Sequence, residues 1–268
     1  MLGKVPFIGF HHVLMFFIAC SIILISLLMA GCTSAPLSNV YLLSLSYIDQ
    51  LSPSHNDSSK INQNVSTMFF DLVSRGGLNA STAVEVRVGF LGFCLRDPSG
   101  IWVCAKSATS LAKFVRESGS FDVDPLNVIW IAKEFQKQSL FSGLWISSIP
   151  LILVCFIILF TFPGWHDEED SAGMEIEVRP FPSRRLSNWA LILVALASFL
   201  SFVSAFWQHI SSATGASMVR SLSYGTIRTV VGPAAMALAW GSVFFLFLTT
   251  FGLLIMIMSI KVLAETFG

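Results

Sequence analysis

Charged residues are scarce in this chain. Asp, Glu, Lys and Arg make up 12% of its 268 residues, and hydrophobic residues make up 54%. Soluble domains carry about 25% charged residues, so this composition indicates a membrane protein. The 16 basic and 16 acidic residues give a formal net charge of zero, which offers no basic footprint for nucleic acid.

The sequence also lacks the common motifs of catalysis and metal binding. Its five cysteines form no C-x-x-C pair or zinc spacing, and it has no G-x-S-x-G, P-loop or H-E-x-x-H motif. We therefore expect no enzyme activity, cofactor or metal ion. Asp122 and Asp124 could bind calcium, but a helix cap is the better interpretation because Ca²⁺ takes about 6–8 oxygen ligands. The acidic run Asp167–Asp170 could bind calcium or a partner, or be a solvated loop.

Four apolar runs are long enough to cross a bilayer, at residues 13–30, 142–162, 189–207 and 234–260. The intervening segments are then an N-terminus (1–12), a large first loop (31–141), a second loop (163–188), a short third loop (208–233) and a tail (261–268). Basic residues favour the cytoplasmic side, and Arg179, Arg184 and Arg185 lie just before the third run. This predicts cytoplasmic termini, a cytoplasmic second loop and exterior first and third loops.

The first apolar run has two other interpretations. A cleavable signal peptide would have a shorter apolar region, and only Lys4 precedes this run. Leu28-Met29-Ala30-Gly31-Cys32 resembles a bacterial lipoprotein box. We favour a transmembrane helix.

Three glycosylation sequons support an exterior first loop. They begin at Asn56, Asn64 and Asn79, and no other sequon occurs in the chain. The compartment that glycosylates asparagine is oxidising, so it permits disulfide bonds.

The first loop contains a predicted β-hairpin at residues 84–104. Apolar and polar residues alternate from Val84 to Phe90, Asp97-Pro98-Ser99-Gly100 is a turn sequence, and residues 101–103 form the return strand. Cys94 and Cys104 lie on the two arms, so we expect a disulfide between them, with Cys32 as the competing partner.

One glycine and two predicted helices are further features of this loop. Gly92 stands among aromatic residues of the hairpin, which suggests that another backbone approaches it closely, either the hairpin's own partner arm or the membrane-proximal helix. Lys106–Glu117 is predicted to be helical, and Asp124-Pro125 to begin another helix that continues into the second span.

These residues resemble a known family. The run Gly89-Phe90-Leu91-Gly92-Phe93-Cys94 with Cys104, Gly31-Cys32-Thr33-Ser34, and Tyr41-Leu42-Leu43-Ser44-Leu45 look like the fungal mating-induced four-span membrane proteins. That resemblance implies a regulator of low-affinity calcium influx and cell fusion. The positions that carry it are Gly89, Phe90, Gly92, Cys94 and Cys104.

A more distant resemblance is to claudins and calcium-channel gamma subunits, which have G-L-W-x-x-C…C in the same loop. It implies a mainly α membrane fold, a four-transmembrane-helix bundle whose extracellular first loop is partly β and stapled by a disulfide. Here the tryptophan, Trp102, precedes the second cysteine instead, which argues against claudin-type lateral adhesion.

Two functions remain open. One is a plasma-membrane regulator of calcium influx and membrane fusion during fungal mating or hyphal fusion. The alternative is a structural tetraspan that organises cortical membrane or cell-wall domains with no calcium role. The expected partners are the lipid bilayer and a calcium-channel subunit or other membrane proteins.

Overall fold

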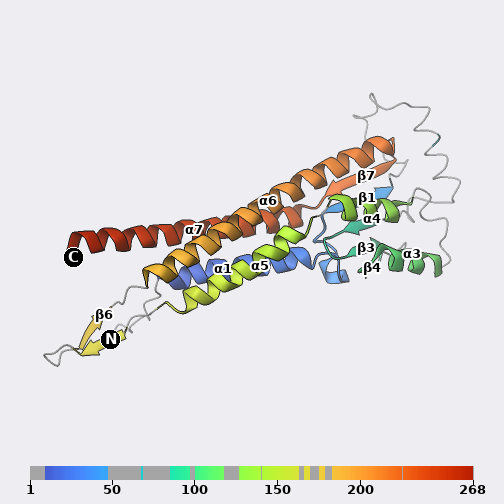
Figure 1. Ribbon diagram of the computed structural model, residues 1–268. Coiled ribbons are helices and arrows are strands. Elements are labelled where there is room, and N and C mark those ends of the chain that lie inside the picture. Colours follow the sequence, from blue (N-terminus) through green and yellow to red (C-terminus); the bar gives the residue numbers. More distant parts are fainter. Residues whose placement is uncertain are drawn as a thin grey trace, which may run out of the picture. The chain divides into compact units, whose positions relative to one another are not determined.

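The computed structural model describes residues 10–47, 68, 85–96, 100–117, 127–139, 141–162, 166–169, 175–178, 183–224 and 226–267. The chain divides into two compact units. The helical unit comprises residues 1–25, 143–204 and 240–268. The sheet unit comprises residues 26–142 and 205–239. Figure 1 labels most of the elements of both.

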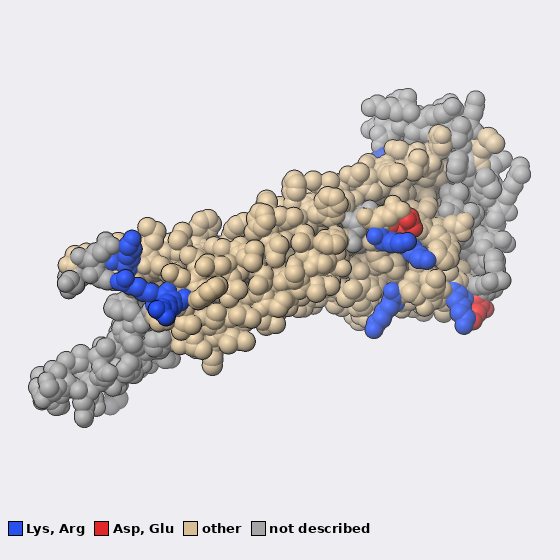
Figure 2. Space-filling view, viewed as in Figure 1, with Lys and Arg blue, Asp and Glu red and all other residues tan. Residues whose placement is uncertain are grey.

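Among the described residues, four helices are long and apolar enough to cross a membrane, as the sequence predicts. They are α1 (Phe10–Met29), α5 (Gly143–Phe160), α6 (Arg184–Leu222) and α7 (Pro233–Phe267). Figure 2 shows a broad surface of the described residues that carries no Lys, Arg, Asp or Glu on the side in view. Such a surface suits a lipid environment, where an exposed charge is costly.

Small and polar side chains join the helices of the helical unit. Ser21 Oγ of α1 donates to the carbonyl of Ser242 in α7 at 3.3 Å. Ser198 of α6 and Thr250 of α7 pair through their hydroxyls at 2.9 Å. Hydrogen bonds and close packing of small residues hold helices together in lipid, which offers no hydrophobic driving force between them.

Helix α6 is much longer than the predicted third span. Its 39 residues extend about 58 Å, roughly twice the bilayer core. Within residues 208–233, which we predicted to form a short exterior loop, α6 continues to Leu222 and β7 (Ile227–Val231) follows. A span predicted from apolar composition ends where composition changes, but a helix continues if its next turns find tertiary contacts.

The sheet unit contains a five-stranded sheet of order β4-β3-β2-β1-β7. All neighbouring strands are antiparallel. The remaining strands are β1 (Leu43–Tyr47), β2 (Glu85–Val88), β3 (Phe93–Arg96) and β4 (Trp102–Ala105). Strand β1 lies between β2 and β7, so segments far apart in the sequence join in one sheet. A second, two-stranded sheet joins β5 (His166–Glu169) to β6 (Glu175–Val178).

Within the predicted hairpin at residues 84–104, Cys94 and Cys104 face each other on paired strands as expected, but the first arm is not one continuous strand. The strand that begins near residue 84 ends at Val88, and β3, not β2, pairs with the return strand β4. A tight turn between β2 and β3 is closed by a hydrogen bond from the Gly89 amide to the Gly92 carbonyl at 2.9 Å. The alternation of apolar and polar residues continues up to Phe90, which is buried as an inward-facing strand residue would be. The sequence pattern therefore gave no sign that the strand ends at Val88.

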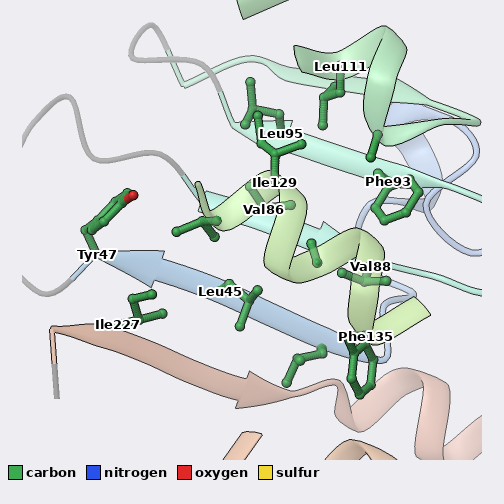
Figure 3. Packing of buried hydrophobic residues seen from close by; sticks show 14 residues of the cluster. Leu45, Tyr47, Val86, Val88, Phe93, Leu95, Leu111, Ile129, Phe135 and Ile227 are labelled. Carbon is green, nitrogen blue, oxygen red and sulfur yellow. The ribbon is translucent and has the colours of Figure 1, made fainter. Parts of the chain in front are cut away.

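One face of the sheet forms the core of the sheet unit (Figure 3). Inward-facing residues of the strands meet α3 (Ala108–Glu117), α4 (Val128–Ser139) and the distal part of α6. The fully or nearly fully buried members include Leu45, Val86, Val88, Phe93, Leu95, Leu111, Ile129 and Phe135. In Figure 3, Ile129 and Phe135 of α4 lie over the strands that carry Val86, Val88 and Leu45.

Of the two helices predicted in the first loop, only the first is present as predicted. The helix predicted at residues 106–117 is confirmed as α3. The second helix does not continue into the second span, because α4 ends at Ser139 and α5 begins at Gly143. Its predicted start at Asp124 and Pro125 lies outside the described residues.

Candidate functional site

The turn between β2 and β3 holds the residues that carried the family resemblance. We call residues 89–94 the motif loop. Gly92 lies directly against the backbone that follows α1: a Cβ there would lie 2.7 Å from the carbonyl carbon of Cys32 and 2.9 Å from Thr33 Cα. A Cβ at Gly89 would lie 2.8 Å from the carbonyl carbon of Gly31. Both glycines are needed because two backbones pack together without room for a side chain.

The segment beneath the motif loop has its own tight fold. Cys32 adopts a left-handed conformation, with φ of 58°, and its amide donates to the Leu37 carbonyl at 3.2 Å. A short 3₁₀ helix follows at Ala35–Leu37. Residues Gly31–Ser34 and the motif loop carry separate parts of the family resemblance. The structure brings the two segments into contact.

Helix α4 secures the motif loop from the other side. The side-chain amide Nε2 of Gln136 donates to the carbonyls of Gly89 at 2.9 Å and Phe90 at 3.1 Å. These bonds satisfy turn carbonyls that face away from the ladder. Gln136 could not be identified from the sequence, because a glutamine on an amphipathic helix does not indicate a distant turn as its partner.

A disulfide joins Cys94 and Cys104, with an S–S distance of 2.02 Å. The two cysteines lie directly opposite each other on β3 and β4, where the Cα atoms are 4.0 Å apart. The disulfide expected from the sequence is therefore present, between the two arms of a hairpin as predicted. The sulfur of Cys94 lies 3.5 Å from the carbonyl oxygen of Cys32, so the bridge and the motif loop share one support.

The competing cysteine remains a free thiol. Cys32 is fully buried, and its Sγ lies 3.5 Å from the Val40 carbonyl, to which it can donate. Burial raises the pKa of the Cys32 thiol to about 12, and the nearby Arg87 charge lowers it only in part. A thiol of this kind is unreactive at neutral pH, because the thiolate is the nucleophile.

Arg87 organises the face of the sheet opposite to the core. Its guanidinium lies 4.1 Å from the ring centroid of Trp102 and 4.7 Å from that of Tyr41. It also pairs with Glu85 at 2.9 Å and donates to the Ser38 carbonyl at 3.1 Å. This links β2 and β4 to the segment after α1. The tryptophan that departs from the claudin pattern thus covers an arginine. This structural role of Arg87 could not be identified from the sequence.

Several predicted sites lie outside the described residues: Asn56, Asn64, Asn79, Asp122, Asp124 and Asp170. Within the described ranges, no group of three or more His, Cys, Asp or Glu side chains could hold a metal ion. The described part of the site therefore consists of residues that hold the fold together: two glycines, a disulfide, a buried thiol and an arginine between two rings.

A comparison with protein-family models shows the family of the chain. The model of the family described as "Ca2+ regulator and membrane fusion protein Fig1" matches residues 73–259. The chain belongs to this family. No curated protein matches the chain in a sequence search.

The Fig1 match contains the whole motif loop, Cys104 and Arg87. With four candidate spans, membership indicates a multi-pass membrane protein. Gly31–Ser34 and Tyr41–Leu45 lie before the matched residues. The structure nevertheless places Gly31, Cys32 and Thr33 against Gly89 and Gly92. The motif loop of this Fig1 protein therefore packs against a segment that lies before the residues matched by the family model.

Proposed function

We propose that this protein regulates low-affinity calcium influx and the fusion of plasma membranes during fungal mating or hyphal fusion, without a catalytic step of its own. The family match over residues 73–259 is the observation that carries this proposal. In this scheme both termini are cytoplasmic and the sheet unit faces the exterior in a claudin-like manner. The three sequons of residues 31–141 and the disulfide support that orientation, because both suit an oxidising, glycosylating compartment.

The sheet unit is suited to recognition of another membrane protein. The motif loop is fixed on three sides, by the Gly31–Thr33 backbone, by Gln136 and by the Cys94–Cys104 bridge. Leu91 at its tip remains 49% exposed. A rigid loop loses little conformational entropy on binding, which favours contact with a partner such as a calcium-channel subunit.

The test is pheromone-stimulated calcium uptake in a strain that lacks this gene. Re-expression of a tagged wild-type protein should restore calcium uptake and cell fusion. A Leu91→Ser variant that reaches the plasma membrane should restore less of both, because it alters the exposed tip without touching the packed glycines. Normal calcium uptake in the deletion strain would contradict the proposal.

The same strain tests the structural alternative. A tetraspan that only organises cortical membrane or wall domains would leave calcium uptake intact, and its loss would disturb static cortical patches. Imaging of the tagged protein separates the two roles: we expect concentration at mating tips or fusion sites.

A further inference from the structure

Aromatic side chains gather where α6 and α7 pack together in the helical unit. The ring of Phe202 on α6 meets two rings of α7: its centroid lies 6.0 Å from that of Trp240 and 6.2 Å from that of Phe247, both edge to face. Phe247 in turn lies 6.5 Å from Phe251, with 30° between the ring planes. These separations are those of interacting aromatic pairs. The rings therefore form one connected surface that crosses the seam between the two helices.

The rings of α7 follow one side of that helix. At about 100° per residue, Phe244, Phe247 and Phe251 lie within about 40° of the direction of Trp240. All of these rings are accessible: Trp240 and Phe247 are 37% exposed, Phe202 is 38% exposed, and Phe244 and Phe251 are 58% and 59% exposed. We call these five side chains the aromatic face. An exposed side chain of a membrane span faces lipid, so the aromatic face is a surface for a lipid.

The lipid-facing surface of α5 has a different composition. Its exposed large hydrophobic side chains are aliphatic up to Phe160, the last residue of the helix: Ile146, Leu153, Val154 and Ile157. Flexible acyl chains adapt to any apolar surface, so contact with bulk phospholipid does not require rings. The aromatic face differs because it presents flat, rigid groups side by side.

The aromatic face has the length and the depth of one leaflet. Trp240 and Phe251 are eleven residues apart, about 16 Å along α7, and the hydrocarbon of one leaflet is about 15 Å thick. The apolar part of α7 is Pro233–Val262. About 20 residues centred within it span the bilayer core, from about residue 238 to residue 257. Trp240 therefore lies near the edge of the hydrocarbon, and Phe251 lies just beyond its middle.

We infer that the aromatic face binds a sterol. A sterol is planar and rigid, it extends over one leaflet, and its single hydroxyl lies at the interfacial end. Its fused rings lie against the aromatic side chains without the loss of conformational entropy that a flexible acyl chain would suffer. The indole N–H of Trp240, at the interfacial end of the aromatic face, donates to the oxygen of the sterol hydroxyl. The inference does not depend on the proposed calcium role.

Photoaffinity labelling of the full-length wild-type protein in phosphatidylcholine liposomes tests this site. The probe is a sterol with a diazirine on its ring system, and mass spectrometry locates the label. We expect label on the peptides that contain Phe202 and residues 240–251. An about tenfold excess of unlabelled sterol should lower this label about tenfold, because the two compete for one site.

Three results of this experiment would overturn the inference. Label spread evenly over α1, α5, α6 and α7 would show contact with bulk lipid only. The same would follow if a diazirine phosphatidylcholine labelled residues 240–251 as strongly as the sterol does. Absence of sterol label from α7 would show that something other than a sterol, such as a helix of another protein, covers the aromatic face.

A pair of variants assigns the sterol to the rings. Phe244→Leu combined with Phe251→Leu removes the two most exposed rings of the aromatic face and keeps apolar side chains, so sterol label on α7 should fall about tenfold. The matched control is Phe160→Leu, which removes a ring of α5 that is 74% exposed, and it should leave the label on α7 unchanged. Equal labelling of the wild type and the double variant would contradict the inference. Should the double variant fail to fold, the wild-type labelling pattern still decides the question.

Trp240→Phe tests the contact with the hydroxyl. In the wild type, unlabelled sterol should compete with the probe better than the corresponding hydrocarbon, which lacks the hydroxyl. The variant keeps an aromatic ring and loses the N–H, so the two competitors should become equal. A preference that is unchanged in the variant would contradict the hydrogen bond from the indole to the sterol.

Discussion

The backbone of Gly92 lies against the backbone of Cys32. The two residues are 60 positions apart, and a Cβ at Gly92 would overlap the carbonyl group of Cys32. From the sequence we predicted that a backbone approaches Gly92 closely, and we expected it to be the partner arm of the hairpin or the membrane-proximal helix. The partner is neither: it is the segment Gly31–Thr33 just past the end of α1.

Replacing Gly92 with alanine should destabilise the protein by about 1–3 kcal/mol, as other overpacking substitutions do. The clash is with backbone atoms, which cannot rotate away as the end of a side chain can. Thermal unfolding followed by fluorescence-detected size exclusion should show a lower midpoint. Gly241→Ala is the matched control, because a Cβ there meets only Leu24 Cδ1 at 3.4 Å. Equal midpoints for the two variants would refute the close-packing argument.

Removal of Cys94 or Cys104 should leave the other as a free thiol, with retention before the plasma membrane. The bridge closes a short loop, and the chain-entropy model gives it roughly 3 kcal/mol. Non-reducing peptide mapping should recover a peptide that links Cys94 to Cys104. A peptide that links Cys32 to either of them would show the present pairing to be wrong.

Cys32 should resist alkylation in the folded protein. Its folded pKa of about 12 lies above the ordinary value of 9.0, so the neutral thiol stabilises the fold at pH below 9 and this contribution is lost as pH rises toward 12. Iodoacetamide at pH 8 should modify Cys32 only after denaturation, and Cys32→Ser should be nearly silent. Rapid labelling of the native protein at this residue would contradict its burial.

Arg87→Lys should cost about 1–2 kcal/mol, although it preserves the charge. A lysine cannot lie flat between Tyr41 and Trp102 while it also bonds Glu85 and the Ser38 carbonyl. Chemical denaturation measures the difference. Lys113→Ala is the control, since Lys113 and Glu117 form an exposed pair that should contribute almost nothing. A larger loss of stability from Lys113→Ala than from Arg87→Lys would contradict this prediction.

The orientation of the chain has a direct test in its sequons. Endoglycosidase should shift the protein expressed in a eukaryotic host to lower apparent mass, and combined substitution of Asn56, Asn64 and Asn79 by glutamine should remove the shift. If wild-type protein migrates identically with and without the enzyme, the exterior placement of residues 31–141 loses its main support.

The sequence alone determined the features that depend on local composition and periodicity. Four apolar runs predicted four helices, because spanning a bilayer requires a long apolar segment whatever its neighbours are. The amphipathic pattern of residues 106–117 predicted α3. The alternation around Val86 and Val88 correctly indicated a half-buried strand, and the motif residues led to the family.

Only the tertiary structure decided which distant segments meet. Strand β7 pairs with β1 across more than half of the chain, and the polar composition of residues 208–233 predicted only a loop there. Gln136 and Arg87 are unremarkable in the sequence, since a hydrogen bond or ring contact leaves no local pattern. The turn at Gly89–Gly92 interrupts a pattern that would otherwise continue as one strand, because the segment after α1 packs against its two glycines. Local periodicity predicts the faces of elements, whereas contacts between distant backbones follow from how the whole chain packs.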